Sequence, residues 1–205
     1  MYIRKLLNNV IDFIFPPNEF EIELRDISTQ NVFNRLPEAN PTEFPFINSV
    51  FSYRNPLVKE LIWQIKYKKN KHALSLAGFA LNKKLLEYPK PFLLIPIPIS
   101  SKRRRERGYN QCEIIINEIT KLNPEIQADF SLLVRNKNID KQTFKNKSQR
   151  IENTKDIFEV TKSSVMDQMI IVIDDVSTTG STLNEARESL LRAGYKDIIG
   201  LTLAH

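Results

Sequence analysis

The stretch IVIDDVSTTGST, residues 171–182, joins an apolar run to two adjacent acidic residues and a turn rich in hydroxyl groups. The apolar run begins at Met169 and reads MIIVI, without alternation between apolar and polar residues. Such a strand is typical of parallel sheets that helices cover on both faces. Asp174 and Asp175 follow where the strand ends. The stretch therefore predicts a buried parallel strand with a polar site at its carboxyl end.

The residues after this turn complete a strand–helix–strand unit. A helical pattern runs from about Ser181 to Ala193, with Gly194 at the position where glycine commonly ends a helix. The apolar run DIIGLTLA follows as the next strand. Strand, helix and strand of these lengths form a crossover between parallel strands. We therefore predict an α/β fold with a largely parallel central sheet flanked by helices.

Upstream, the apolar spacing predicts three more helices and one more buried strand. The helices are expected at about 56–67 with Asn55 as N-cap, at about 73–87, and at about 112–122; the run PFLLIPIPI is the expected strand. The residues expected to be buried are Leu57, Leu61, Ile62, Trp63, Ile65, Leu74, Ala77, Leu81, Leu85, Cys112, Ile115, Ile116, Ile119 and Leu122.

The composition excludes several classes of protein. One cysteine and two histidines exclude an intrachain disulfide and a cysteine-based zinc cluster. No run approaches the roughly 18 apolar residues that a membrane-spanning helix needs. We therefore expect a cytoplasmic protein whose main domain is residues 51–205. Residues 1–50, with five prolines and no sustained period, are expected to be an irregular accessory segment.

The polar turn has the features of a site for a sugar phosphate. Gly180 allows an unusual backbone conformation close to a ligand, and the following helix directs free N–H groups at the same place. The expected phosphate ligands are Ser177, Thr178, Thr179, Gly180, Ser181 and Thr182. Asp174 and Asp175 suit sugar hydroxyls or a metal ion instead. The alternative, a turn that only caps a helix, requires one such residue rather than this series.

These residues resemble a known family. The segment from Ile170 to Thr182 is similar to the signature of type I phosphoribosyltransferases, which bind phosphoribosyl pyrophosphate (PRPP). The segments LIWQIKYKKNKHALSLA, LIPIPISSKRRRERGYNQ and LTLAH resemble the ComF/GntX branch of that family, named for natural competence for DNA uptake. The spacing of Gln142, Arg150, Asn153 and Phe158 is also similar to that branch.

Two features depart from the branch. Its members usually begin with paired zinc-binding cysteines around a Phe-Pro dipeptide, and here Phe15 and Pro16 are present without the cysteines. Ile139 stands where a threonine would be usual.

The resemblance implies roles for the charged residues. Asp174 and Asp175 would serve the ribose hydroxyls and a Mg²⁺ ion held through PRPP. The basic loop after Pro98 would bind pyrophosphate through Ser100, Ser101, Lys102, Arg103 and Arg107. A flexible loop with Lys141, Lys145 and Arg150 would close over the site.

The residues leave three classes of function open. The first is a phosphoribosyltransferase with an unknown acceptor, and the second is a non-catalytic module that binds PRPP or single-stranded DNA in DNA uptake. The third is an interaction protein, with competence proteins as its expected partners, in which the site is a relic. The net charge of +6 and the run KRRRER favour anionic partners, although charge runs are often solvated surface, as we expect for KYKKNK, residues 66–71. Tyr109 would either pack or stack on a base.

Overall fold

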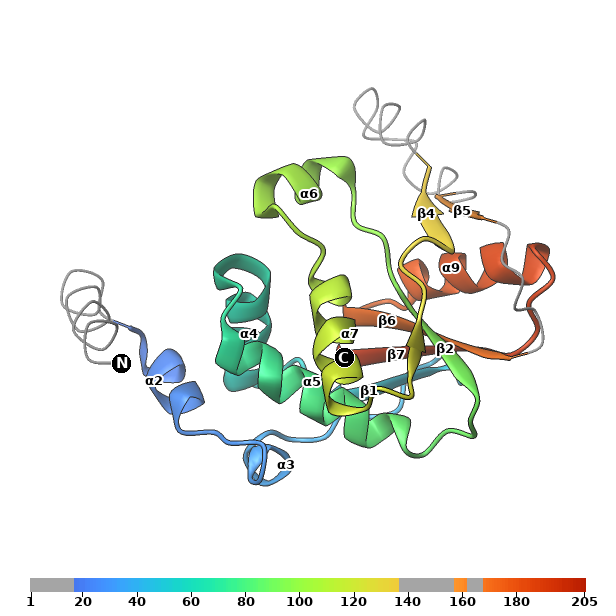
Figure 1. The fold of residues 1–205 in the computed structure, drawn as a ribbon. Coiled ribbons are helices and arrows are strands. Elements are labelled where there is room, and N and C mark those ends of the chain that lie inside the picture. Colours follow the sequence, from blue (N-terminus) through green and yellow to red (C-terminus); the bar gives the residue numbers. More distant parts are fainter. Residues whose placement is uncertain (1–16, 137–156, 162–167) are drawn as a thin grey trace.

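The computed structural model describes residues 17–136, 157–161 and 168–205 (Figure 1). Its centre is a five-stranded sheet in which every pair of neighbours is parallel, in the order β1-β7-β6-β2-β3. The strands are β1 (Ile47–Phe51), β7 (Ile198–Ala204), β6 (Met169–Val176), β2 (Phe92–Pro96) and β3 (Gln127–Ala128). The predicted α/β fold with a parallel sheet is confirmed.

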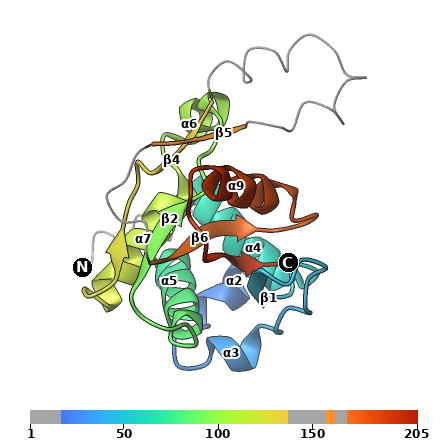
Figure 2. The ribbon, with the colours of Figure 1, turned by 90° about the vertical axis from the view of Figure 1, so that its right-hand side faces the viewer.

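Helices cover both faces of this sheet. One face carries α4 (Pro56–Trp63), the π-helical turn η1 (Gln64–Lys68), α5 (Lys71–Leu85) and α7 (Gln111–Leu122). The other face carries α9 (Ser181–Arg192) and the antiparallel pair β4 (Leu133–Arg135) and β5 (Phe158–Val160). Figure 2 shows α5 and α9 on opposite sides of β6.

The strand β6 contributes to both cores, as its sequence predicts. Ile171 and Ile173 pack with the core under α5 and α7, whereas Ile170 and Val172 pack with the core under α9. All four side chains are at most 1% exposed. The apolar run therefore lacks alternation because both of its faces are buried.

The amino-terminal segment is more regular than its composition suggests. Its described part contains α2 (Glu19–Arg25), α3 (Val32–Arg35) and most of β1, and the predicted boundary at residue 51 falls inside that strand. Asn18 caps α2 by accepting a hydrogen bond from the Glu21 N–H at 2.8 Å. Leu24 and Val32 join the main core. These helices are too short for a sustained apolar period.

The predicted helices form close to their expected positions. Asn55 caps α4 by accepting hydrogen bonds from the N–H groups of Leu57 and Val58 at 2.9 and 3.3 Å. The predicted burial is wrong for two residues. Trp63 is 42% exposed because it faces away from the buried side of α4, and Leu122 is 52% exposed because it is the last residue of α7. No helix in the described part of the chain is long and apolar enough to cross a membrane.

The predicted basic loop after Pro98 is instead the short helix α6 (Ser101–Arg107). Ser100 caps it by accepting a hydrogen bond from the Arg103 N–H at 3.2 Å, and Gly108 ends it with φ of 78°. Lysine, arginine and glutamate are good helix formers, so the charged run needs only these two caps to be helical.

Gly78 allows α5 and α7 to pack closely. A Cβ atom at this position would lie 2.7 Å from Glu118 Cβ and 3.4 Å from the Glu118 backbone. We predict that Gly78→Ala destabilises the protein by about 1–3 kcal/mol, although alanine is the better helix former. Urea denaturation measures the effect, with the exposed Ser75→Ala on the same helix as control. Equal or higher stability of Gly78→Ala would contradict the close packing.

Candidate functional site

The site begins with two buried carboxylates at the end of β6. Asp174 and Asp175 are 8% and 4% exposed. Asp174 Oδ1 accepts hydrogen bonds from the Asp175 N–H at 2.8 Å and from Cys112 Sγ at 3.6 Å. Asp175 Oδ2 lies 2.9 Å from Lys66 Nζ in an ion pair that lacks hydrogen-bond geometry. This oxygen can therefore still accept a hydrogen bond or bind a cation.

Burial changes the protonation of this acidic pair. Removal from water, together with the negative charge of Asp175, raises the pKa of Asp174 to about 8. The same burial raises the pKa of the Cys112 thiol, so the sulfur stays protonated. Without a ligand, one carboxyl group is thus neutral and the other is paired with Lys66.

The hydroxyl-rich turn encloses a small polar cavity next to the carboxylates. This cavity of about 40 Å³ is lined by Asp174, by the predicted phosphate ligands Ser177, Thr178, Thr179, Gly180, Ser181 and Thr182, and by Val176 and Leu183. Ser177 Oγ is buried and has no hydrogen-bond partner among the described residues. Such a hydroxyl is expected to bind a ligand or a water molecule.

Gly180 has the predicted unusual backbone conformation. The position where a side chain would begin, however, faces the protein interior rather than the cavity. Its φ is 70°, a conformation that favours glycine. A Cβ atom at this position would lie 2.5 Å from the ring of Phe44 and 3.1 Å from Ile47 Cδ1. A larger residue would therefore clash with the protein rather than fill the cavity.

A larger cavity of about 600 Å³ joins the acidic pair to the basic helix. Four of the predicted residues from the end of β6 and the turn after it line this cavity, namely Asp174, Asp175, Thr178 and Thr182. Three from α6 and its N-cap also do so, namely Ser100, Arg103 and Arg107. Thr179 and Ser181 line only the small cavity, where their hydroxyl groups are 2.9 Å apart. The structure thus brings acidic side chains of β6 and basic side chains of α6 to one cavity.

The other predicted residues of the basic helix are not in this cavity. Ser101 and Lys102 do not line it, and Lys102, 66% exposed, lies 3.9 Å from Glu106. Arg104 instead binds Glu113 through two hydrogen bonds of 2.7 and 3.2 Å. Only part of the positive charge of α6 therefore faces the carboxylates.

Sequence reasoning missed Lys66, which was expected on a solvated surface. Its side chain is only 20% exposed because it reaches Asp175 and lines the large cavity. It lies in η1, which ends at Lys69 with φ of 47° before Asn70 caps α5. π-Helical turns are rare and occur frequently at functional sites. The sequence carries only a weak signal for this turn, the cap residue Asn70 soon after the first helix.

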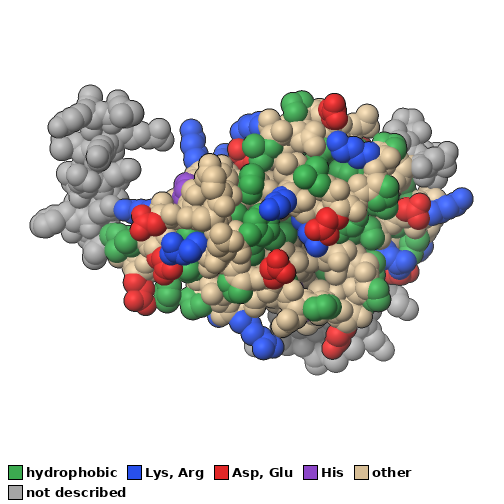
Figure 3. Space-filling model, turned by 90° about the horizontal axis from the view of Figure 1, so that it is seen from below, with side chains coloured by type: hydrophobic (Ala, Val, Ile, Leu, Met, Phe, Trp, Pro, Cys, Tyr) green, Lys and Arg blue, Asp and Glu red, His purple; other side chains and the backbone are tan. Residues whose placement is uncertain are grey.

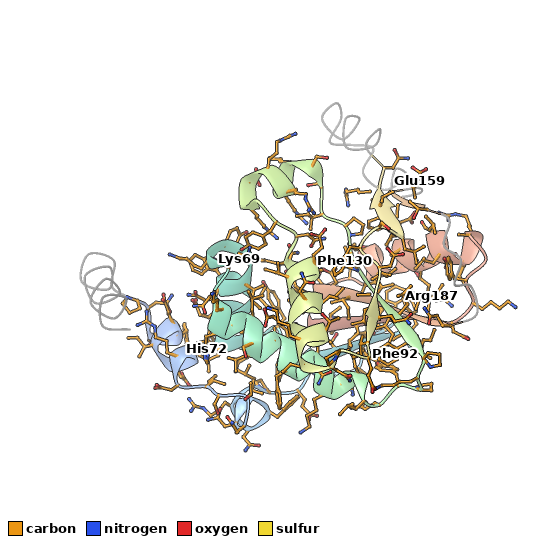
Figure 4. All side chains as sticks on the ribbon, viewed as in Figure 1. Lys69, His72, Phe92, Phe130, Glu159 and Arg187 are labelled. Carbon is orange, nitrogen blue, oxygen red and sulfur yellow. The ribbon has the colours of Figure 1, made fainter. Side chains whose placement is uncertain are left out.

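Tyr109 packs rather than remaining open for stacking. Its hydroxyl donates a hydrogen bond to the Ile65 carbonyl at 2.7 Å, and Lys69 Nζ lies 5.2 Å from its ring centre. Lys69 is labelled in Figure 4, at the turn after η1.

Arg107 lies over the Tyr67 ring at 5.2 Å and donates a hydrogen bond to Gln111 at 2.8 Å. These contacts join η1 to the end of α6.

The predicted flexible loop with Lys141, Lys145 and Arg150 lies outside the described residues. The residues on either side of that segment line the large cavity. Arg135 and Phe158 belong to β4 and β5, and the guanidinium carbon lies 5.9 Å from the ring centre. The described residues that flank this segment therefore lie next to the site.

The acidic pair fits a magnesium ion that a ligand helps to hold. No group of three or more acidic, histidine or cysteine side chains among the described residues could bind a metal alone. Mg²⁺ commonly binds through one or two carboxylates together with phosphates of the substrate. Asp174 and Asp175 supply such carboxylates, and Asp175 Oδ2 accepts no hydrogen bond from the described residues.

Known proteins with similar sequences are competence and DNA utilization proteins. No protein-family model matches the chain. The competence protein ComFC of Bacillus subtilis is 31% identical over 148 residues, which are 71% of this chain and 58% of that protein. The DNA utilization protein YhgH of Escherichia coli K12 is 26% identical over 160 residues, 75% of this chain and 69% of YhgH. The chain thus spans little more than half the length of ComFC.

The fold was also compared with solved structures. A hypoxanthine phosphoribosyltransferase from Staphylococcus aureus aligns with 71% of this chain and 63% of its own, at 17% identity and a TM-score of 0.37.

The raised pKa of Asp174 predicts that the contribution of this residue to the free energy of unfolding falls as pH rises from about 4 to about 8. In this window the unfolded chain loses the Asp174 proton while the folded protein keeps it, so protonation favours the folded state. An asparagine side chain does not ionise in this range, and its carbonyl oxygen can still accept the hydrogen bonds that Asp174 Oδ1 accepts. Asp174→Asn should therefore be more stable than the parent at pH 8, by an amount that grows by about 1 kcal/mol per pH unit across the window.

Urea denaturation over this pH range measures both curves. The exposed Asp197→Asn is the control and should follow the parent. Parallel curves for Asp174→Asn and the parent would contradict the neutral form of Asp174.

Proposed function

Since the chain belongs to the ComF-like branch of the type I phosphoribosyltransferase family, we propose that it binds PRPP and transfers the phosphoribosyl group to an acceptor. We further propose that it acts in the cytoplasm, where its single cysteine would stay reduced. The observation that carries the proposal is that one cavity is lined by the acidic pair of β6 and by two arginines of α6. Asp174, Asp175, Arg103 and Arg107 all line it, and the hydroxyl-rich turn encloses a smaller cavity that shares Asp174 with it.

PRPP has three parts that match three parts of this site. Its 5′-phosphate would bind the N–H and hydroxyl groups of residues 177–182, at the start of a 12-residue helix. Its ring hydroxyls would bind Asp174 and Asp175. Its pyrophosphate would bind Ser100, Arg103 and Arg107. The buried Ser177 hydroxyl without a partner supports the first of these assignments.

In the proposed reaction a lone pair of the acceptor forms a bond to C1 of the ribose. The bond from C1 to the pyrophosphate oxygen breaks, its electron pair leaves with pyrophosphate, and a proton on the attacking atom passes to water. Positive charge that develops on the ribose is stabilised by Asp175, and negative charge on pyrophosphate by Arg103 and Arg107. When bound, Mg²⁺ would neutralise pyrophosphate oxygens and favour the ionised form of Asp174.

A second candidate is a module that binds PRPP or single-stranded DNA in DNA uptake without catalysis. The names of ComFC and YhgH favour it, as does the cluster of five cations on α6. Figure 3 shows the surface viewed from below, where acidic and basic side chains are interspersed. The α6 side is therefore the better candidate for contact with nucleic acid phosphates.

Calorimetric titration with PRPP and Mg²⁺ tests the proposal. We predict that Arg103→Gln and Arg107→Gln each weaken PRPP binding by at least about tenfold, because each removes a charged hydrogen-bond donor. Ribose 5-phosphate lacks pyrophosphate, so its affinity should change little. Lys102→Gln on the same helix is the matched control and should leave both affinities unchanged.

Three outcomes separate the candidates. Equal losses for both ligands, or an equal loss in Lys102→Gln, would contradict the pyrophosphate assignment. Absence of PRPP binding to the parent protein would reject the proposed function. Tight PRPP binding without release of pyrophosphate in the presence of acceptors would favour the non-catalytic module.

A further inference from the structure

A second cavity of about 450 Å³ adjoins the PRPP cavity on the side of α2 and α4. Tyr53, Lys66 and Tyr67 line both cavities, so the two share a wall. The second cavity is also lined by Phe20, Lys59 and Trp63. We call it the aromatic groove. Through Lys66, it lies next to the acidic pair.

The aromatic side chains of the groove are unusually open to solvent. Trp63 is 42% exposed and Tyr67 is 59% exposed, and their ring centres are 5.8 Å apart at an angle of 45°. Among the described residues, Phe130 is the one other aromatic side chain in the group of exposed large apolar residues. Clustered and exposed aromatic rings are a feature of binding surfaces rather than of solvated ones.

The groove presents positive charge together with these rings. Lys59 Nζ lies 5.9 Å from the Tyr53 ring centre, and Lys68 Nζ lies 5.5 Å from that of Trp63. Glu60 also lines the groove but is 9% exposed. Its carboxylate accepts hydrogen bonds from Gln64 at 2.7 Å and from Asn18 at 3.4 Å. These neutral amides hold the carboxylate in place but leave its charge, so the groove is lined by one anion and by the two cations Lys59 and Lys66.

We propose that the aromatic groove binds a planar aromatic small molecule that carries an acidic group. The rings supply stacking surfaces for its plane, and Lys59 and Lys66 supply cations for its acidic group. Because the groove opens beside the acidic pair, this molecule is placed to be the acceptor. That role, unlike the binding itself, rests on the proposed function.

Lys66 couples the two cavities. Without ligands its ammonium group is paired with Asp175, and a divalent cation bound with PRPP would replace it there. The ammonium group then becomes available to the aromatic groove. PRPP with Mg²⁺ should therefore raise the affinity for the acidic ligand, and the ligand should raise the affinity for PRPP by the same factor.

Fluorescence of Trp63 gives a direct test, because Trp63 is the single tryptophan of the chain. Benzoate, benzamide and cyclohexanecarboxylate are titrated separately against the 205-residue chain. We expect benzoate to change the fluorescence with about fivefold higher affinity than either analogue, since one lacks the charge and the other the aromatic plane. Addition of PRPP and Mg²⁺ should move the benzoate curve to lower concentration.

Variants locate the binding. Tyr67→Leu and Lys59→Gln should each weaken benzoate binding severalfold, whereas Phe130→Leu, an exposed aromatic away from the groove, should not. Equal affinities for the three compounds, or no response at all, would overturn the proposal. A response to a single-stranded oligonucleotide but not to benzoate would overturn it in favour of a nucleic acid path.

The proposed function and the aromatic groove can be rejected independently of each other. PRPP binding by calorimetry without any benzoate response rejects the aromatic groove alone. A benzoate response that Tyr67→Leu weakens, in a protein that does not bind PRPP, supports the groove and rejects the proposed function. A benzoate curve that PRPP and Mg²⁺ leave unchanged overturns the coupling through Lys66.

Discussion

The ion pair between Lys66 and Asp175 is the interaction on which the site depends. Two adjacent carboxylates buried at the end of β6 repel each other and lose hydration, so they require a cation or a proton. Lys66 supplies the cation from η1, while Asp174 keeps its proton. The same turn contacts Arg107 of α6 through Tyr67 and the following Tyr109 through the Ile65 carbonyl. Its Lys66 and Tyr67 line both cavities. The acidic and basic parts of the site are thus joined through one short turn.

The order of the strands explains why the cavity lies where it does. The connection from β6 through α9 leads to β7 on one side, and the connection from β2 through α7 leads to β3 on the other. In open α/β sheets ligands bind where neighbouring connections diverge in this way, at the carboxyl ends of the strands. Asp174 and Asp175 end β6, and Ser100 follows β2. Their meeting in one cavity follows from the topology.

The sequence predicts the parts of the fold that depend on local pattern. The run MIIVI, the caps at Asn55 and Gly194, and the apolar spacing of the helices predict the sheet and its crossover correctly. The role of Lys66 could not be predicted, because a lysine in a run of charged residues looks the same whether it is solvated or paired across the fold. The exposed position of Trp63 was missed because large aromatic residues are mostly buried. The helix α6 was missed because its charges carry no apolar period.

A crystal structure of the protein with PRPP and Mg²⁺ tests the central claim most directly. The account predicts the 5′-phosphate on the amides of residues 177–182, the ribose hydroxyls at Asp174 and Asp175, and pyrophosphate between Arg103 and Arg107. It also predicts that Lys66 Nζ leaves Asp175. PRPP bound elsewhere, or bound at this cavity with Lys66 still on Asp175 and pyrophosphate away from α6, would contradict it.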